Sequence, residues 1–130
     1  MAFEVFKRQR APSSTDPTVT IQKTGRLSLN QAAFAQLGHP KFVELLYDRD
    51  QRLIGLRKVT KSVHHGYPVR RVSVNASSWV VSGKAFLDFY DITIDATRRW
   101  ITQTQGQALV VDLKQPGEKV GRDRAEGGWD

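Results

Sequence analysis

The sequence contains no cysteine, three histidines and no long hydrophobic run. Without cysteine the chain can form neither a disulfide nor a thiolate metal site. No apolar stretch approaches the roughly 18 residues that a membrane-spanning helix requires, and no apolar segment near the start suggests a secretion signal. We therefore expect a protein of the reducing cytoplasm that makes no membrane contact.

Acidic residues are scarce relative to basic ones. The 130 residues include 20 Lys and Arg against 13 Asp and Glu, which gives a formal net charge of +7. A basic chain of this size is a candidate for a polyanionic partner, because neutralising phosphates releases their condensed counterions. The hydrophobic content of 39% is ordinary for a globular chain, so we expect one domain, or two small units with a common core.

Patterns that would indicate an enzyme or a metal site are absent from the sequence. His64 and His65 are adjacent, so in a strand they would point to opposite faces, and no carboxylate lies at helical ligand spacing from either. The sequence has no phosphate-cradling glycine loop, nucleophile elbow or catalytic triad pattern. We expect a protein that is not an enzyme, with no catalytic residues, no bound metal and no cofactor.

The two ends of the chain differ in composition from the middle. Residues 1–17 combine a basic cluster with two prolines and a run of hydroxyl residues, which predicts a basic arm and linker. Residues 115–130 are polar and rich in glycine, which predicts a mobile tail. The residues between these ends are therefore expected to form the folded body.

Residues 18–61 have the pattern of a strand pair, a short helix and a hairpin. Polar and apolar residues alternate on both sides of Gly25, as in two half-buried strands joined by a turn. Asn30 can cap the helix that follows, and Gly38 can end it. Two apolar segments separated by a charged turn then predict a hairpin over residues 42–59.

Residues 62–114 contain a connector followed by a second, divergent copy of this pattern. The alignment that places Phe34 on Phe86 also aligns the strands that precede the two helices. A further strand pair is predicted over residues 99–113. The hairpin aligns when five residues are inserted after the helix, so that Ile54 lies on Val111. We predict a duplicated unit whose halves share one core, because each half is too small to fold alone.

The helix of the second copy is predicted over residues 83–90. Ser82 stands where a helix cap is needed, and Ala85, Phe86 and Phe89 would then share one face. The alternative to a duplication is a plain mixed sheet with two short helices.

Residues 19–59 resemble the swapped-hairpin DNA-binding domains of the AbrB-like transition-state regulators. The matching pieces are Ile21, the Lys23-Thr24-Gly25-Arg26 turn, Leu27 to Leu29, the helix ending at Gly38, Val43 to Tyr47, and Ile54 to Lys58. In that family two copies interleave, so the resemblance implies a mixed, β-rich α+β fold in which duplicated strand-helix-hairpin units form one swapped-hairpin-like β-barrel. This chain lacks the family's usual proline at Asn30 and an arginine within the helix, and its second copy lacks the glycine-arginine turn.

The basic residues gather at turns and strand ends, which the resemblance would place against duplex DNA. The predicted DNA-contacting residues are Lys7, Arg8 and Arg10 in the arm, and Lys23, Arg26, Arg57, Lys58, Lys61, Arg70, Arg71, Arg98 and Arg99 in the body. Arg26 and its neighbours would face a groove, and the others would contact phosphates. We expect Trp79 and Trp100 in the core rather than on the surface as stacking platforms.

These observations predict a non-enzymatic DNA-binding protein of the transcription-regulator type. Two alternatives stay open. One is a structural or protein-interaction module whose basicity serves an acidic partner. The other is a binder of single-stranded DNA or RNA that uses exposed aromatic residues. Both a monomer and a homodimer with symmetric half-sites fit the sequence.

Overall fold

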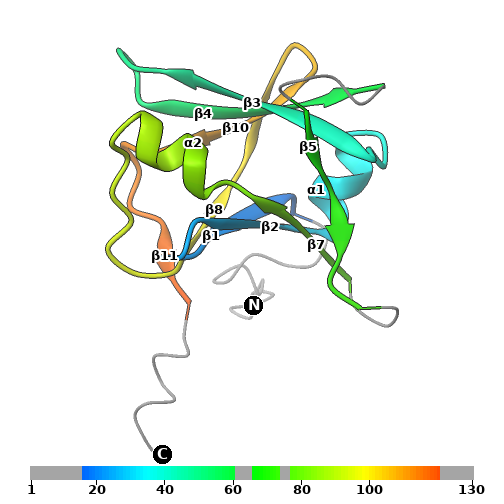
Figure 1. Ribbon diagram of the computed structural model, residues 1–130, viewed down its shortest axis with the longest axis horizontal. Coiled ribbons are helices and arrows are strands. Elements are labelled where there is room, and N and C mark those ends of the chain that lie inside the picture. The colour runs from blue at the N-terminus through cyan, green and yellow to red at the C-terminus, as the bar shows by residue number, and fades with distance from the viewer. Residues whose placement is uncertain (1–15, 61–65, 74–76, 121–130) are drawn as a thin grey trace, which may run out of the picture.

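The computed structural model describes residues 16–60, 66–73 and 77–120. In this part of the chain the strands form two antiparallel sheets that face each other, with a short helix at either side (Figure 1). The first sheet has the strand order β11-β8-β1-β2-β7-β6 and the second the order β5-β3-β4-β10-β9. The predicted β-rich architecture with two short helices is thereby confirmed.

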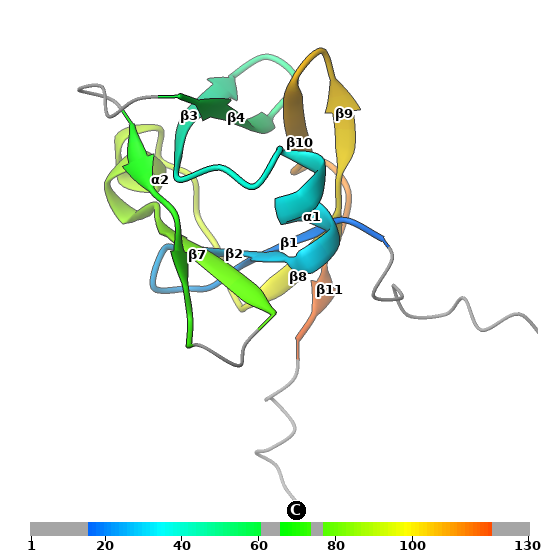
Figure 2. The ribbon, with the colours of Figure 1, turned by 90° about the vertical axis from the view of Figure 1, so that its right-hand side faces the viewer.

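Each sheet contains strands from both halves of the chain. The first sheet consists of β1 (Thr18–Ile21), β2 (Arg26–Asn30), β6 (Arg70–Arg71), β7 (Ser78–Ser82), β8 (Arg98–Ile101) and β11 (Glu118–Lys119). The second sheet consists of β3 (Phe42–Asp48), β4 (Leu53–Val59), β5 (Tyr67–Pro68), β9 (Gln103–Gln105) and β10 (Ala108–Asp112). The helices are α1 (Gln31–Gln36) and α2 (Lys84–Phe89), and Figure 2 shows α1 lying between the edges of the two sheets.

At two places in the described chain, consecutive strands pass from one sheet to the other with a single residue between them. β5 and β6 are separated only by Val69, and β8 and β9 only by Thr102. At each bend the backbone N–H extends one strand ladder by a residue: that of Val69 donates to the Lys41 carbonyl and that of Thr102 to the Pro17 carbonyl. The described strands are nevertheless divided between two sheets, so they do not form the closed β-barrel that we predicted.

One core fills the space between the sheets and includes residues from both halves of the chain. Its fully buried side chains include Val19, Ile21, Leu27, Leu29, Val43, Ile54, Leu56 and Val111. Buried and less buried residues alternate along β1 and β2, as the predicted period of two requires. Trp100 is buried, and Trp79 is half-buried and stacks on Phe34 with ring centroids 4.1 Å apart.

Asn30 caps α1 and also ties the start of β1 to it. Its Oδ1 accepts the backbone N–H of Ala33 at 2.9 Å and that of Thr18 at 3.0 Å. Its Nδ2 donates to the carbonyl of Asp16 at 2.7 Å. The predicted cap is confirmed, and a single side chain here satisfies backbone groups of two elements.

The hairpin predicted over residues 42–59 is confirmed as β3 and β4. The two strands pair in register from Phe42 with Val59 to Asp48 with Leu53. The Asp48 carboxylate accepts the backbone N–H groups of Asp50 and Gln51 in the turn, at 3.0 and 3.1 Å. This is the turn chemistry expected of an aspartate at the first turn position.

The start of α2 differs from the prediction. Ser82 is the last residue of β7, and the helix cap is Gly83, which makes no side-chain cap bond. A Cβ at residue 83 would lie 2.4 Å from Leu27 Cδ1, so this close contact fits only glycine there. The predicted shared face is therefore wrong: Phe86 is buried together with Leu87, whereas Ala85 is exposed and Phe89 is 72% exposed.

The predicted tail begins later than residue 115. The indole N–H of Trp100 donates to the Gln115 carbonyl at 3.0 Å, and Gly117 lies against the indole ring, where an added Cβ would be 2.5 Å from Cε2. Glu118 and Lys119 then form β11 beside β8. The buried indole supplies both a donor and a flat surface, so residues 115–120 belong to the folded body.

The turn between β1 and β2 provides a test of the packing around α2. Gly25 has a φ of 95°, and an added Cβ would lie 2.6 Å from Lys84 Cα, whereas Gly106 has a φ of 59° and open space around it. We predict that Gly106→Ala lowers the free energy of unfolding by about 1 kcal/mol, from the backbone conformation alone. Gly25→Ala should lower it by about 3 kcal/mol or more, because the turn must also move away from α2.

Urea denaturation of the two variants measures this difference. Equal losses of stability would show that the turn is free to move away from α2, and would contradict the close packing described here.

Candidate nucleic-acid interface

One row of side chains crosses the first sheet on its outer face. The strand register places Arg99 beside Thr20, Thr20 beside Ser28, Ser28 beside Val80, and Val80 beside Arg70. Directly paired residues of antiparallel strands point to the same face of a sheet. The residues on either side of Thr20 and Ser28 are fully buried, so this outer row faces away from the core.

The outer row has an arginine at each end and small side chains at its centre. Arg70 and Arg99 lie four strands apart, which at a strand spacing of about 4.8 Å separates their Cα atoms by about 19 Å. Arg26 lies two residues before Ser28 on the same face, is exposed and pairs with Ser82. Three of the predicted DNA-contacting residues are thus brought to one face from three different strands.

The turn that precedes Arg26 presents a fourth predicted residue. The backbone N–H of Gln22 donates to the Arg26 carbonyl at 2.9 Å, and that of Gly25 donates to the Gln22 carbonyl at 2.8 Å. These bonds close a tight turn with Lys23 exposed at its tip. The predicted pair Lys23 and Arg26 therefore lies at the same end of the first sheet.

Arg99 is the arginine of the row that is partly neutralised. Its Nη2 donates to Glu118 Oε1 at 2.9 Å, and the two side chains are 32% and 48% exposed. An ion pair this exposed to water contributes little, typically about 0.2–1 kcal/mol. The buried Nε of Arg99 has no hydrogen-bond partner within the described residues, so the guanidinium retains unused donor capacity.

Two of the predicted residues lie on the second sheet instead. Arg57 forms an ion pair with Glu44 on its outer face, and Lys58 donates to the Gly38 carbonyl at 3.2 Å. The two sheets face each other across the core, so these cations do not join the outer row. Glu44 offsets the charge of Arg57, whereas Lys58, whose partner is a neutral carbonyl, keeps its charge.

The remaining predicted residues occupy other positions. The Arg71 guanidinium lies 5.4 Å from the ring centroid of Trp79, on the core side of the sheet. Arg98 pairs with Ile21 in the register and also points to the core side, where it meets Asp95. Four predicted residues fall outside the described residues: Lys7, Arg8, Arg10 and Lys61.

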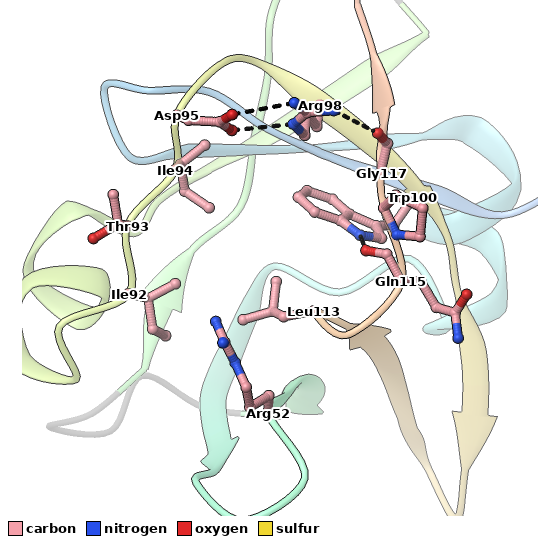
Figure 3. Close-up of a pocket in the computed structure, with 11 residues that line it drawn as sticks. Arg52, Ile92, Thr93, Ile94, Asp95, Arg98, Trp100, Leu113, Gln115 and Gly117 are labelled. Atoms are coloured by element: carbon pink, nitrogen blue, oxygen red, sulfur yellow. Dashed lines mark hydrogen bonds and ion pairs between the residues drawn. The ribbon is translucent and has the colours of Figure 1, made fainter.

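A pocket of about 300 Å³ lies on the core side of β8, next to the edge of the first sheet (Figure 3). Its apolar lining includes Ile92, Ile94, Trp100 and Leu113, and its ionisable lining consists of Arg52, Asp95 and Arg98. The pocket could not be predicted from the sequence, because its lining comes from three separate segments of the chain.

Asp95 and Arg98 form a forked ion pair at the rim of the pocket. Arg98 Nε donates to Asp95 Oδ1 and Nη2 donates to Oδ2, both at 3.1 Å, and Nη1 donates to the Gly117 carbonyl at 3.0 Å. The hydrogen bond from Arg98 lowers the pKa of Asp95 below its usual 3.8. At Asp112, the backbone N–H of Lys114 lowers the carboxyl pKa in the same direction.

No metal-binding constellation is present in the described part of the chain, where no three His, Asp or Glu side chains converge. His39 packs edge-on against Phe34, and His64 and His65 lie outside the described residues. Neither α1 nor α2, the helices of the described residues, is long and apolar enough to cross a membrane.

Comparison with known proteins identifies no relative of this chain. No protein-family model, no curated protein and no solved structure matches the chain. The resemblance to the AbrB-like domains therefore stays a prediction.

The Asp95–Arg98 pair leads to a prediction about acid stability. A carboxyl whose pKa is lowered in the folded state stabilises the fold above its unfolded pKa, and this contribution is lost as the pH falls through the folded pKa. Asp95→Asn should therefore reduce the loss of stability between about pH 5 and pH 2, measured by urea denaturation at each pH.

The control is Asp91→Asn, which removes a carboxylate that takes part in no ion pair within the described residues. If Asp95→Asn and Asp91→Asn had the same pH profile, the forked pair would not contribute to acid stability.

Proposed function

We propose that the protein is a non-enzymatic DNA-binding protein that contacts duplex DNA through the outer face of the first sheet. The proposal is based on the outer row. This row aligns Arg70 and Arg99 on one face of the first sheet, four strands apart, and Arg26 lies on the same face. A guanidinium can donate two parallel hydrogen bonds to one phosphate, which makes arginine well suited to nucleic-acid contacts. A role in transcription regulation, in the cytoplasm, would follow from such binding.

The centre of the row favours a close approach by a nucleic-acid backbone. Thr20 and Ser28 have short side chains with hydroxyl groups, and they lie between the arginines. Hydroxyl side chains commonly contact phosphate oxygens, and such contacts position a protein on DNA without reading its sequence. An acidic protein partner would not need hydroxyl groups between the cations, which is why we favour nucleic acid.

The aromatic residues favour a duplex over a single strand. Single-strand binders stack bases on exposed aromatic rings. Within the described strands of the first sheet, Trp79 and Trp100 both lie on the core side, and the exposed ring of Phe89 belongs to α2. The ends of the outer row, about 19 Å apart, can instead reach phosphates on both sides of a major groove that is about 12 Å wide.

We also infer that the two halves of the chain arose by duplication and form swapped-hairpin units. The alignment that places Phe34 on Phe86 also places Ser28 on Val80, and these two residues pair directly. The hairpin alignment places Ile54 on Val111, and these residues pair directly as well. Antiparallel pairing of equivalent residues implies a local two-fold axis at each pair, which supports the proposed duplication.

A mobility-shift titration with a duplex of about 20 base pairs tests the proposed interface. Replacing Arg26, Arg70 and Arg99 together by Gln should weaken binding at least about tenfold at about 50 mM salt, because three phosphate contacts are lost. The slope of log K against log salt should also fall by up to about 3.

The matched control removes the same charge elsewhere, by replacing Arg49, Arg57 and Lys58 together by Gln. It should change the affinity less than about threefold, since these residues lie on the second sheet and its turn. A third variant, Glu118→Gln, should tighten binding because a carboxylate no longer competes for Arg99. Equal weakening by the two triple variants, or no binding by the unmodified chain at low salt, would refute the proposal.

A further inference from the structure

The pocket beside β8 joins three parts of the chain that are distant in sequence. Arg52 comes from the β3–β4 turn, Ile92 to Asp95 follow α2, and Trp100 lies on β8 beneath the loop that leads to β11 (Figure 3). Its volume of about 300 Å³ is at the lower end of the range found for small-molecule sites. The pocket is therefore large enough for a small organic molecule.

The walls of the pocket are apolar and held in place by the core. Ile92 and Trp100 are 8% and 7% exposed, and Leu113 and Ile94 pack against the same core. The Trp100 indole is fixed by its hydrogen bond to the Gln115 carbonyl. Such walls can cover the apolar body of a ligand without first having to rearrange.

The charged groups of the pocket differ in whether they are already satisfied. Asp95 and Arg98 bind each other, and Arg98 also binds the Gly117 carbonyl. By contrast, the guanidinium of Arg52 makes no hydrogen bond or ion pair within the described residues. Figure 3 shows it extending toward the space between Ile92 and Leu113.

Arg52 is exposed, but a hydrogen bond fixes its backbone. Arg52 has a φ of 57°, which is uncommon for a residue other than glycine, and its carbonyl accepts the backbone N–H of Leu113 at 3.0 Å. The bond ties the β3–β4 turn to the end of β10, so the arginine projects from a fixed point beside an apolar wall. An unpaired cation beside apolar walls is the arrangement that a ligand with an anionic end and an apolar body would complete.

We propose that this pocket binds a small monocarboxylate with an aromatic or branched aliphatic body. The carboxylate would pair with Arg52, and the body would lie against Ile92, Leu113 and the Trp100 ring. The ionised side chains of the pocket sum to a single positive charge, from Arg52 and Arg98 against Asp95, so a monoanion balances them. A phosphate dianion fits less well, because Asp95 would repel its second charge. This proposal does not depend on DNA binding.

Benzoate and its neutral analogue benzamide form a matched pair of probes for the site. In ¹H–¹⁵N NMR spectra of the full chain, the indole N–H of Trp100 should shift saturably with benzoate. That of Trp79 should not, since Trp79 lies on β7, three strands away from β8 in the first sheet. Benzamide should bind at least about tenfold more weakly, because it cannot form the ion pair.

Two arginine variants locate the charge that is responsible. Arg52→Gln should abolish the preference for benzoate over benzamide, and Arg49→Gln, in the same turn but stacked on Tyr90, should keep it. The proposal would be overturned by equal affinities for the two probes, by an unchanged preference in Arg52→Gln, or by no saturable shift of Trp100 at about 10 mM benzoate. If a variant does not fold, the affinities of the unmodified chain for benzoate and benzamide still test whether the pocket prefers a carboxylate.

Discussion

The pairing of β2 with β7 is the constraint on which the rest of the structure depends. It joins the two halves of the chain within one sheet and fixes which residues face the core. Leu27 and Val81 face inward as a pair, while Ser28 and Val80 face outward. Since strand side chains alternate, a slip of one residue would exchange these faces. The register that buries the core is thus the same register that aligns the outer row, so stability and the proposed DNA contact share one cause.

The two sheets of this molecule present different surfaces. The first sheet carries Arg26, Arg70 and Arg99 on its outer face. Among the described residues, only Arg99 of these three forms an ion pair, with Glu118, which the register places beside it. On the second sheet Arg57 is paired with Glu44, and Lys58 is bonded to a backbone carbonyl. The net charge of +7 is a property of the whole chain, but the placement of partners decides where unneutralised charge lies. This asymmetry is what makes one face the better candidate for a polyanion.

Local patterns in the sequence predicted local structure well. The alternation around Gly25, the Asn30 cap and the β3–β4 hairpin depend on near neighbours, and the structure has all three. Features set by long-range contacts were missed. The start of α2 depends on packing between residue 83 and Leu27, and the order of residues 115–120 depends on Trp100. Sequence alone also could not separate the arginines of the outer row from Arg57 or Arg98, because their faces follow from the strand register.

Residue-by-residue mapping of the surface that contacts DNA would show whether the outer row is the binding face. In ¹H–¹⁵N spectra of the chain titrated with a short duplex, the account predicts that the amides of Thr20, Ser28 and Val80 shift. These residues lie at the centre of the outer row. The amides of Leu46, Gly55 and Val110, which pair across the second sheet, should stay in place. Shifts concentrated on the second sheet, or spread evenly over both, would contradict the account.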